Sequence, residues 1–292
     1  MPSPTQLLEQ AIAAFAADGD PSALTSAEAQ QAAHALASGP MTPQEAELVL
    51  VTFGLPLIQL SVNQASPGEL DAIAAALLVF DQSLARYLEP SDLGRIADRL
   101  DMAATTFRNG LEDDEAEPVV WAALARWWGA LAAALPPDYP KMTVFLANLG
   151  LTLERVFHLT HDRDALERAV DAQRRTLAVT PQEKPIWVAS ASRCGLNHLR
   201  LYDLTSDLAA IEQAVALCRE AVGLTPNSDP GKPDYVGNLA VALFALWETT
   251  GDRAALDEAI ASWELALELA PEDFLARDRY EDYLATAKAA RP

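Results

Sequence analysis

The side chains best suited to chemistry in this chain are its histidines and cysteines. His158 and His161 stand beside Asp162 and Asp164 in the stretch HLTHDRD, and imidazole with carboxylate is a common set of metal ligands. Their spacing across an expected helix end is poor geometry for a closed site, and the matching positions farther along the chain hold other residues. We therefore interpret this stretch as an ordinary polar corner, with a metal site as the alternative.

A second candidate is the pair Cys194 and His198, one helical turn apart. A nucleophilic thiol needs a positioned base, which His198 would supply. Free cysteine more often behaves as a small buried hydrophobe, and the same holds for Cys218. Two cysteines also fit a reduced cytoplasmic interior better than a disulfide framework. The sequence contains no Gly-rich phosphate loop, HExxH or CxxC. We predict no catalytic residue, no metal and no cofactor.

These candidates lie in a sequence that repeats every 45 residues. THDRDALERAV begins at Thr160, TSDLAAIEQAV at Thr205 and TGDRAALDEAI at Thr250. In each copy an Asp can cap a helix, a small Ala allows two helices to approach, and a proline ends the unit. A fixed period of this length indicates stacked helical hairpins, because one hairpin cannot bury its apolar stripe alone. The matched positions are Asp162/Asp207/Asp252, Leu166/Ile211/Leu256, Ala169/Ala214/Ala259, Val170/Val215/Ile260 and Pro181/Pro226/Pro271.

Composition and charge limit the function classes. Hydrophobic residues make up 50% of the 292, mostly Ala and Leu, with only 13 Gly, which favours an all-α protein. The net charge of −21, from 42 acidic and 21 basic residues, argues against a general nucleic-acid binder. Neither a long apolar run nor a secretory leader is evident, so we expect a cytoplasmic protein without a membrane span.

The third copy, NLAVALFALWETTGDRAALDEAIASWELALELAP, resembles the tetratricopeptide repeat (TPR) family. The family's Leu-Gly pair corresponds to Leu149–Gly150, Cys194–Gly195 and Leu239–Ala240. The family's repeat is normally 34 residues long, and the 45-residue period here is similar to TPR arrays of actinobacterial proteins. The resemblance implies a right-handed α-solenoid of stacked antiparallel hairpins, whose first helices line a concave, protein-binding groove.

We divide the chain into three parts. Residues 143–271 hold the three repeats, residues 272–292 form one amphipathic capping helix, and residues 1–142 are a diverged, degenerate TPR-like region. In the diverged region, GDPSAL at 19–24 resembles the repeated corner, and TPQE from Thr42 and SPGE from Ser66 are capping boxes. Pro56 should kink or split the helix that begins near Pro43. Pro136 precedes Pro181 by 45 residues, so residues 91–135 are a candidate fourth unit with its corner at 111–118.

The resemblance also points to residues of the groove. Spacings of i, i+3 and i+7 place three in-register sets on one face of the first helices. Asn can hold a peptide backbone, and guanidinium groups can grip carboxylates, so a partner with acidic groups or a free carboxylate would fit. The alternative is that the arginines pair with acidic neighbours such as Glu154. The eight residues are Asn148, Leu151, Arg155, Arg193, Leu196, Arg200, Asn238 and Val241.

The predicted function is a protein–protein interaction scaffold that binds a peptide or partner domain without chemistry of its own; self-association is a further option. One alternative is a regulatory or sensor segment of a signalling effector. Another is an enzyme or small-molecule binder with a pocket inside the superhelix, lined by residues such as His198, Arg200 and Tyr202. Trp127 and Trp128 lie about 100° apart on a helix, so either one of them belongs to a binding surface or both pack between hairpins.

Overall fold

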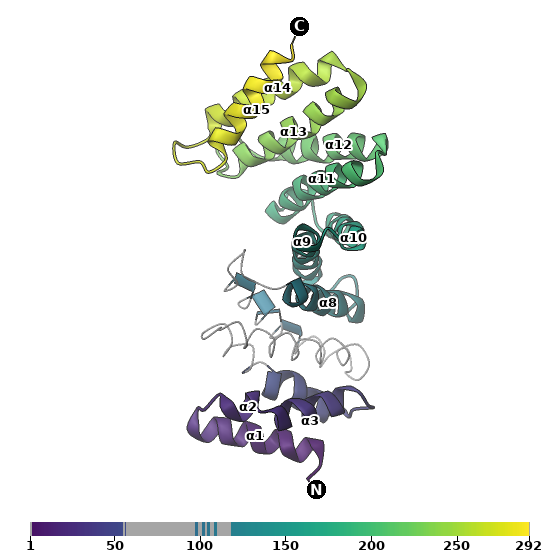
Figure 1. Cartoon of the computed structure of the whole chain (residues 1–292), viewed down its shortest axis with the longest axis vertical. Helices are drawn as coiled ribbons and strands as arrows, with labels where there is room; N and C mark the ends of the chain where they lie inside the picture. Colours follow the sequence, from purple (N-terminus) through teal and green to yellow (C-terminus); the bar gives the residue numbers. More distant parts are fainter. Residues whose placement is uncertain are drawn as a thin grey trace. The chain divides into compact units, whose positions relative to one another are not determined.

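The computed structural model of the chain describes residues 2–54, 56, 97–98, 101–102, 104–105, 108–109 and 118–291. It divides into two compact units, which we call unit 1 (Met1–His161) and unit 2 (Asp162–Pro292). Every element in the described ranges is helical, which confirms the all-α prediction of helical hairpins (Figure 1). No helix among these residues is long and apolar enough to cross a membrane.

The described elements of unit 1 are α1 (Pro4–Asp18), α2 (Ser22–Thr25), α3 (Ala27–Ala37), α4 (Pro43–Glu47), the π-helix η1 (Leu48–Phe53), α8 (Pro118–Ala134) and α9 (Met142–Thr160). Those of unit 2 are α10 (Arg163–Val179), α11 (Pro185–Thr205), α12 (Leu208–Leu224), α13 (Lys232–Thr250), α14 (Arg253–Leu269) and α15 (Arg277–Ala289).

The 45-residue period is visible in the helix boundaries. Helices α8, α10, α12 and α14 each begin 45 residues after the previous one and each end 45 residues after it. We call these helices B. The helices that follow them (α9, α11, α13 and α15) are helices A. Helix α8 thus occupies the helix B position of the candidate fourth unit.

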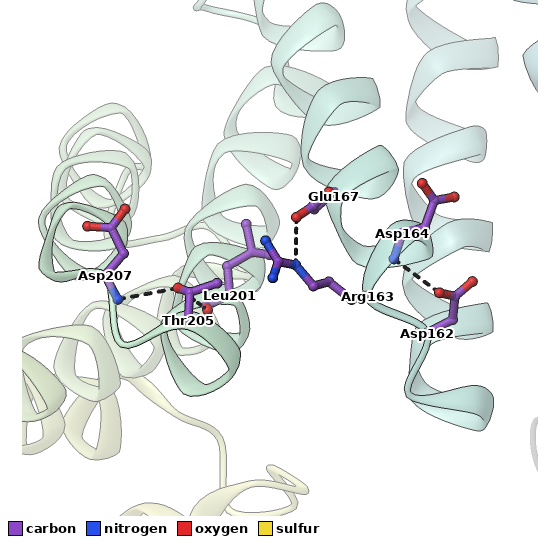
Figure 2. Close-up of polar contacts among 7 residues, drawn as sticks. All are labelled: Asp162, Arg163, Asp164, Glu167, Leu201, Thr205 and Asp207. Carbon is purple, nitrogen blue, oxygen red and sulfur yellow. Dashed lines mark hydrogen bonds and ion pairs between the residues drawn. The ribbon is translucent and has the colours of Figure 1, made fainter.

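Each repeated corner is held by the same hydrogen bonds. The helix A ends on a residue in the left-handed region, at His161 (φ 55°), Ser206 (φ 56°) and Gly251 (φ 73°). The following Asp caps helix B, because its side chain accepts a hydrogen bond from the backbone N–H two residues on. Figure 2 shows this bond between Asp162 and Asp164. The predicted capping role of the three aspartates is confirmed.

A threonine ends each of the three helices A that precede a corner, α9, α11 and α13. The Thr205 hydroxyl donates to the Leu201 carbonyl oxygen (2.7 Å) and accepts from the Asp207 backbone N–H (3.3 Å), as Figure 2 shows. Thr250 makes the same two bonds, to Leu246 and from Asp252. One hydroxyl therefore satisfies a terminal carbonyl and orients the capping residue, which explains why the corner recurs almost unchanged.

The links from helix B to helix A also repeat. The backbone N–H of Tyr139, Lys184, Asp229 and Phe274 donates to the carbonyl oxygen of the proline three residues earlier. At two links a basic side chain then caps the preceding helix B. Lys232 Nζ donates to the carbonyl oxygens of Val222 and Thr225 (both 2.6 Å), and Arg277, 45 residues later, bonds those of Leu267 and Ala270. These side chains satisfy helix C-terminal carbonyls that would otherwise have no partner.

The successive helices α11 to α15 of unit 2 pack against one another (Figure 1), and buried apolar side chains fill the space between them. The matched Leu/Ile, Ala and Val/Ile positions of helices B are all buried, so each helix B presents one apolar stripe to the neighbouring helices A. A glycine permits the closest approach. A Cβ at Gly237 of α13 would stand 2.2 Å from the Tyr280 ring of α15, so only glycine fits there.

The N-terminal part of unit 1 repeats some of these features. Gly19 ends α1 with φ 67°, and Asp20 accepts from the Ser22 backbone N–H (2.9 Å), as at the later corners. The capping box at Thr42 is present, with Glu45 as its partner. The regular helix from Pro43 ends at Glu47 and continues as η1, so the helix is interrupted upstream of Pro56. The capping box at Ser66 and the loop 111–117 lie outside the described residues.

Two predictions are corrected here. The residues from 272 onward do not form one continuous helix. Because Pro271 opens the same turn as the earlier prolines, the helix begins only at Arg277. The idea that Trp127 or Trp128 belongs to a binding surface is wrong, since both side chains are fully buried in α8. The predicted boundaries at 142/143 and 271/272 stay predictions.

Candidate functional site

The helices A of unit 2 carry five of the eight predicted groove residues. Arg193, Leu196 and Arg200 lie on α11, and Asn238 and Val241 lie on α13. Asn238 Nδ2 donates to Ser192 Oγ (3.0 Å), which joins the two helices beside Arg193. Arg193 is exposed, and the other four are half-buried. We call the surface that these five residues mark the helix-A face.

The helix-A face continues onto α15. Tyr283 stands 45 residues after Asn238, is 41% exposed, and packs its ring 5.7 Å from that of Trp263. Tyr280, one turn earlier, contacts Gly237 of α13. Three successive helices A therefore place in-register positions side by side, from the cationic Arg193 to the aromatic Tyr283.

A buried amide pair supports Arg200. Arg200 Nη1 donates to Asn197 Oδ1 (2.5 Å), and Asn197 Nδ2 donates to Gln173 Oε1 of α10 (3.1 Å). Asn197 is 0% and Gln173 1% exposed, so the bond between the two amides forms away from water, whereas the bond to Arg200 is partly buried. The chain of bonds orients the guanidinium group on the helix-A face. The sequence prediction did not include Gln173 or Asn197.

The remaining three predicted residues belong to unit 1. Asn148 of α9 is 8% exposed, accepts from Arg108 Nη1 (2.6 Å) and donates to Asp101 Oδ1 (3.4 Å). The same Asp101 oxygen accepts from Trp128 Nε1 (3.1 Å), and burial raises the pKa of Asp101. The amide of Asn148 thus makes hydrogen bonds within its own chain.

Arg155 and Leu151 lie farther along the same helix. The Arg155 guanidinium lies 5.9 Å from the centroid of the Trp121 ring of α8, a cation–π contact, and Leu151 is half-buried. The eight predicted residues therefore divide into three in unit 1 and five in unit 2, and the role of each in binding stays a prediction.

The thiols and His198 are unsuited to nucleophilic chemistry. Burial raises the pKa of both Cys194 and Cys218 to about 12, so both are protonated thiols at neutral pH. Burial, with Arg174 nearby, lowers the pKa of His198 to about 4, so the imidazole is neutral. His198 Nε2 lies 3.4 Å from Arg174 Nη2. The neutral imidazole of His198 and the thiol of Cys194, one turn apart on α11, are therefore buried packing groups.

The HLTHDRD stretch is a corner in the structure. His161 caps the C-terminus of α9, its N–H donating to the Phe157 carbonyl oxygen (2.7 Å), and its ring contacts that of Phe157. Asp162 caps the N-terminus of α10. In the described part of the chain, no three His, Cys, Asp or Glu side chains are placed so that they could hold a metal ion.

The helix-A face has a hollow at its C-terminal end, between the start of α13 and the start of α15. Its volume is 630 Å³. Asp234 of α13 and Arg279 of α15 line it, and the link between α14 and α15 contributes the rest of its wall. Partial burial raises the pKa of Asp234, opposed by the Arg279 guanidinium. The complete lining is Asp234, Pro271, Asp273, Phe274, Leu275, Ala276 and Arg279.

The sequence holds a signal for this hollow that the prediction of groove residues did not use. Asp234 lies four residues before Asn238, on the same side of α13, and Arg279 occupies the matching position of α15. Leu275 stands where the three preceding links carry Pro140, Pro185 and Pro230. It is completely exposed. Asp234 differs from Val144 and Ala189 within the aligned repeats, and extending the 45-residue alignment past Pro271 would have revealed Leu275 and Arg279.

Comparison with known proteins gives weak similarities. No protein-family model and no curated protein matches the chain. Among solved structures, a thermophilic TPR protein from Thermus thermophilus is 23% identical, with 70% of this chain and 99% of that chain covered and a TM-score of 0.38. A designed cyclic homooligomer is 15% identical (96% and 94% covered, TM-score 0.22). The designed helical repeat DHR64 is 14% identical (96% and 93% covered, TM-score 0.18).

Proposed function

We propose that this chain is a protein-interaction scaffold, and that the helix-A face of unit 2 binds an extended peptide segment of a partner protein. The observation that carries the proposal is the continuity of the face. The Asn238–Ser192 bond and the Gly237–Tyr280 contact hold three helices A together, with polar and apolar groups in register. Such a surface can hold a peptide backbone by hydrogen bonds and its side chains by apolar contact.

The cationic end of the face favours an acidic group or a free carboxylate on the peptide. Arg193 is exposed, and Arg200 is oriented by the buried amide pair. A guanidinium group binds a carboxylate through parallel hydrogen bonds, and a pre-oriented one loses less side-chain entropy on binding. On a chain with net charge −21, the two guanidinium groups lower the repulsion of an acidic segment at this part of the face.

The test is selection of binding peptides from a random displayed library, on the wild-type chain and on two variants with equal charge change. Arg193→Glu/Arg200→Glu alters the helix-A face, and Arg175→Glu/Arg253→Glu alters exposed positions of helices B. We expect the first variant to lose the wild-type peptides and the second to retain them. Equal selection by all three proteins would contradict binding at this face, and concentration-dependent mass in light scattering would favour self-association.

A further inference from the structure

Among the residues that line the hollow between α13 and α15, Asp234, Leu275 and Arg279 differ in type from those at the matching positions of α9, α11 and the preceding links. The position of Asp234 and Arg279 holds Val144 and Ala189 in the two earlier helices A. The linker position of Leu275 holds proline in the three preceding links. From residue 136 onward, an exposed apolar residue in the link and charged residues at the matched positions of both neighbouring helices A occur together only at this hollow.

The hollow has two carboxylates available to a ligand. Among the described residues, the carboxylates of Asp234 and Asp273 have no hydrogen bond and no ion pair within 4.0 Å, and Arg279 attracts the Asp234 carboxylate only at longer range. The third charged group, Arg279, lies with its guanidinium 5.6 Å from the centroid of the Tyr280 ring. The two carboxylates and one guanidinium group that line the hollow therefore give it a net negative charge, and the whole chain is also negatively charged.

The rest of the lining is apolar. The wall is formed by Pro271, Phe274 and Ala276. The side chain of Leu275, in the link between α14 and α15, is fully exposed at its edge. A volume of 630 Å³ lies within the range of about 300–1,000 Å³ found for ligand pockets. An apolar wall beside carboxylates suits a side chain with an aliphatic stem and a cationic head, because the stem is buried while the head is paired.

We infer that the hollow binds a lysine or arginine side chain of the peptide that lies on the helix-A face. Asp234 and Asp273 pair with its cationic head, and Phe274 and Leu275 contact its stem. This inference rests on the proposed function. It adds that a basic side chain of the bound peptide is held in the hollow between α13 and α15. The bound segment carries opposite charges at its two ends, acidic over α11 and basic over the hollow.

The experiment selects peptides from a random displayed library on the full chain and on matched variants. Asp234→Asn/Asp273→Asn removes the two carboxylates at nearly constant shape. Glu272→Gln/Asp278→Asn makes the same charge change at exposed positions beside the hollow. Leu275→Pro restores the residue of the other links. Circular dichroism and thermal unfolding establish that each variant remains folded.

We expect lysine and arginine to be enriched among wild-type and Glu272→Gln/Asp278→Asn peptides, and this enrichment to disappear with Asp234→Asn/Asp273→Asn. For one selected peptide, the affinity should fall about fivefold with the Asp234→Asn/Asp273→Asn chain and also with replacement of the peptide's basic residue by methionine. The two changes combined should cost no more than either alone, since both remove one interaction. Leu275→Pro should weaken binding to a smaller extent.

Enrichment of basic residues that survives Asp234→Asn/Asp273→Asn, or additive losses in the double-mutant cycle, would overturn the inference. So would peptides that need Arg193 and Arg200 but contain no basic residue, a result that leaves the proposed function intact. Failure of every protein to select any peptide would instead contradict the proposed function itself.

Discussion

We call the interface between a helix B and the helix A that follows it a joint. The first and last joints of unit 2, α10–α11 and α14–α15, have a similar backbone arrangement and differ in the side chains buried between the helices. At α10–α11 the buried contact is polar, with Gln173 bonded to Asn197. At α14–α15 the matching helix B position is Trp263, which packs against the rings of Phe244 and Tyr283, and the matching helix A position is Ala287. At both joints the helix B has the same bounds, 90 residues apart, an Asp caps its N-terminus, and a proline opens the link to the helix A.

This difference separates what builds the repeat from what specialises it. Capping residues and closing prolines fix where each helix begins and ends, so the backbone tolerates different contents in the joint. The helix B position can hold Trp128, Gln173, Cys218 or Trp263, all buried. At the polar joint the buried amides orient Arg200, and at the aromatic joint Trp263 supports the exposed Tyr283. Each joint thus sets the chemistry of the helix-A face above it.

The largest effect is expected at the aromatic joint. Trp263→Ala removes the contacts with Phe244 and Tyr283 and leaves a large cavity, which should cost about 4 kcal/mol of unfolding free energy. Urea unfolding followed by circular dichroism gives the loss, and amide hydrogen exchange should locate it in α13–α15. A cost below about 1 kcal/mol would mean that the joint collapses without Trp263.

The polar joint should respond to pH. The pKa of His198 is lowered to about 4 in the folded chain from 6.5, so the unfolded chain binds the proton more tightly. The contribution of the neutral His198 to the free energy of unfolding is present above pH 6.5. It is lost as the pH falls toward 4, by up to about 3 kcal/mol. Leucine occupies the matching positions 153 and 243, so we expect His198→Leu to be tolerated and to flatten this part of the stability–pH curve. An unchanged curve would show that another group is responsible.

Breaking the amide pair is expected to cost less. Asn197→Ala leaves the Gln173 carboxamide buried without its partner and should cost about 2 kcal/mol. Replacing both members, as in Asn197→Ala/Gln173→Leu, should recover part of that loss, because neither buried polar group remains. Equilibrium unfolding of the single and double variants forms the cycle. Strictly additive losses would show that the two amides do not depend on each other.

The shared corners should give the smallest and most uniform effect. Asp207→Ala and Asp252→Ala each remove one N-cap bond, at about 1 kcal/mol. Because the two corners have the same bonds, thermal unfolding should give the two variants nearly equal losses. A large difference between them would mean that the corners are not equivalent, and would weaken the separation of backbone plan from joint contents.

Much of the fold was predictable because the sequence repeats local signals. The Asp caps and the buried apolar positions at fixed spacing each act within a few residues, so their effect does not depend on the rest of the chain. The start of α15 was mispredicted because the amphipathic pattern of the helix extends back through the preceding link. This link has Leu275 where the earlier links have a second proline, so the sequence there does not signal a break. Burial of both Trp127 and Trp128 needed knowledge of what surrounds α8 on each side, which periodicity along one helix does not contain.

The candidate site was predictable only in part. The in-register residues of helices A could be read from the period, but their partners could not. Asn197 and Gln173 meet across two helices, 24 residues apart, and Arg108 reaches Asn148 across 40. Such pairings depend on the crossing of helices and not on local spacing. The hollow likewise depends on where α13, α15 and their link converge.

The most direct test of the central claim is photo-crosslinking of a library-selected peptide to the full chain, with the modified residues located by mass spectrometry. We predict crosslinks to the helix-A face of unit 2, at residues such as Leu196, Val241 and Tyr283. Crosslinks confined to exposed residues of α10, α12 or α14 would contradict the proposal that helices A form the binding surface.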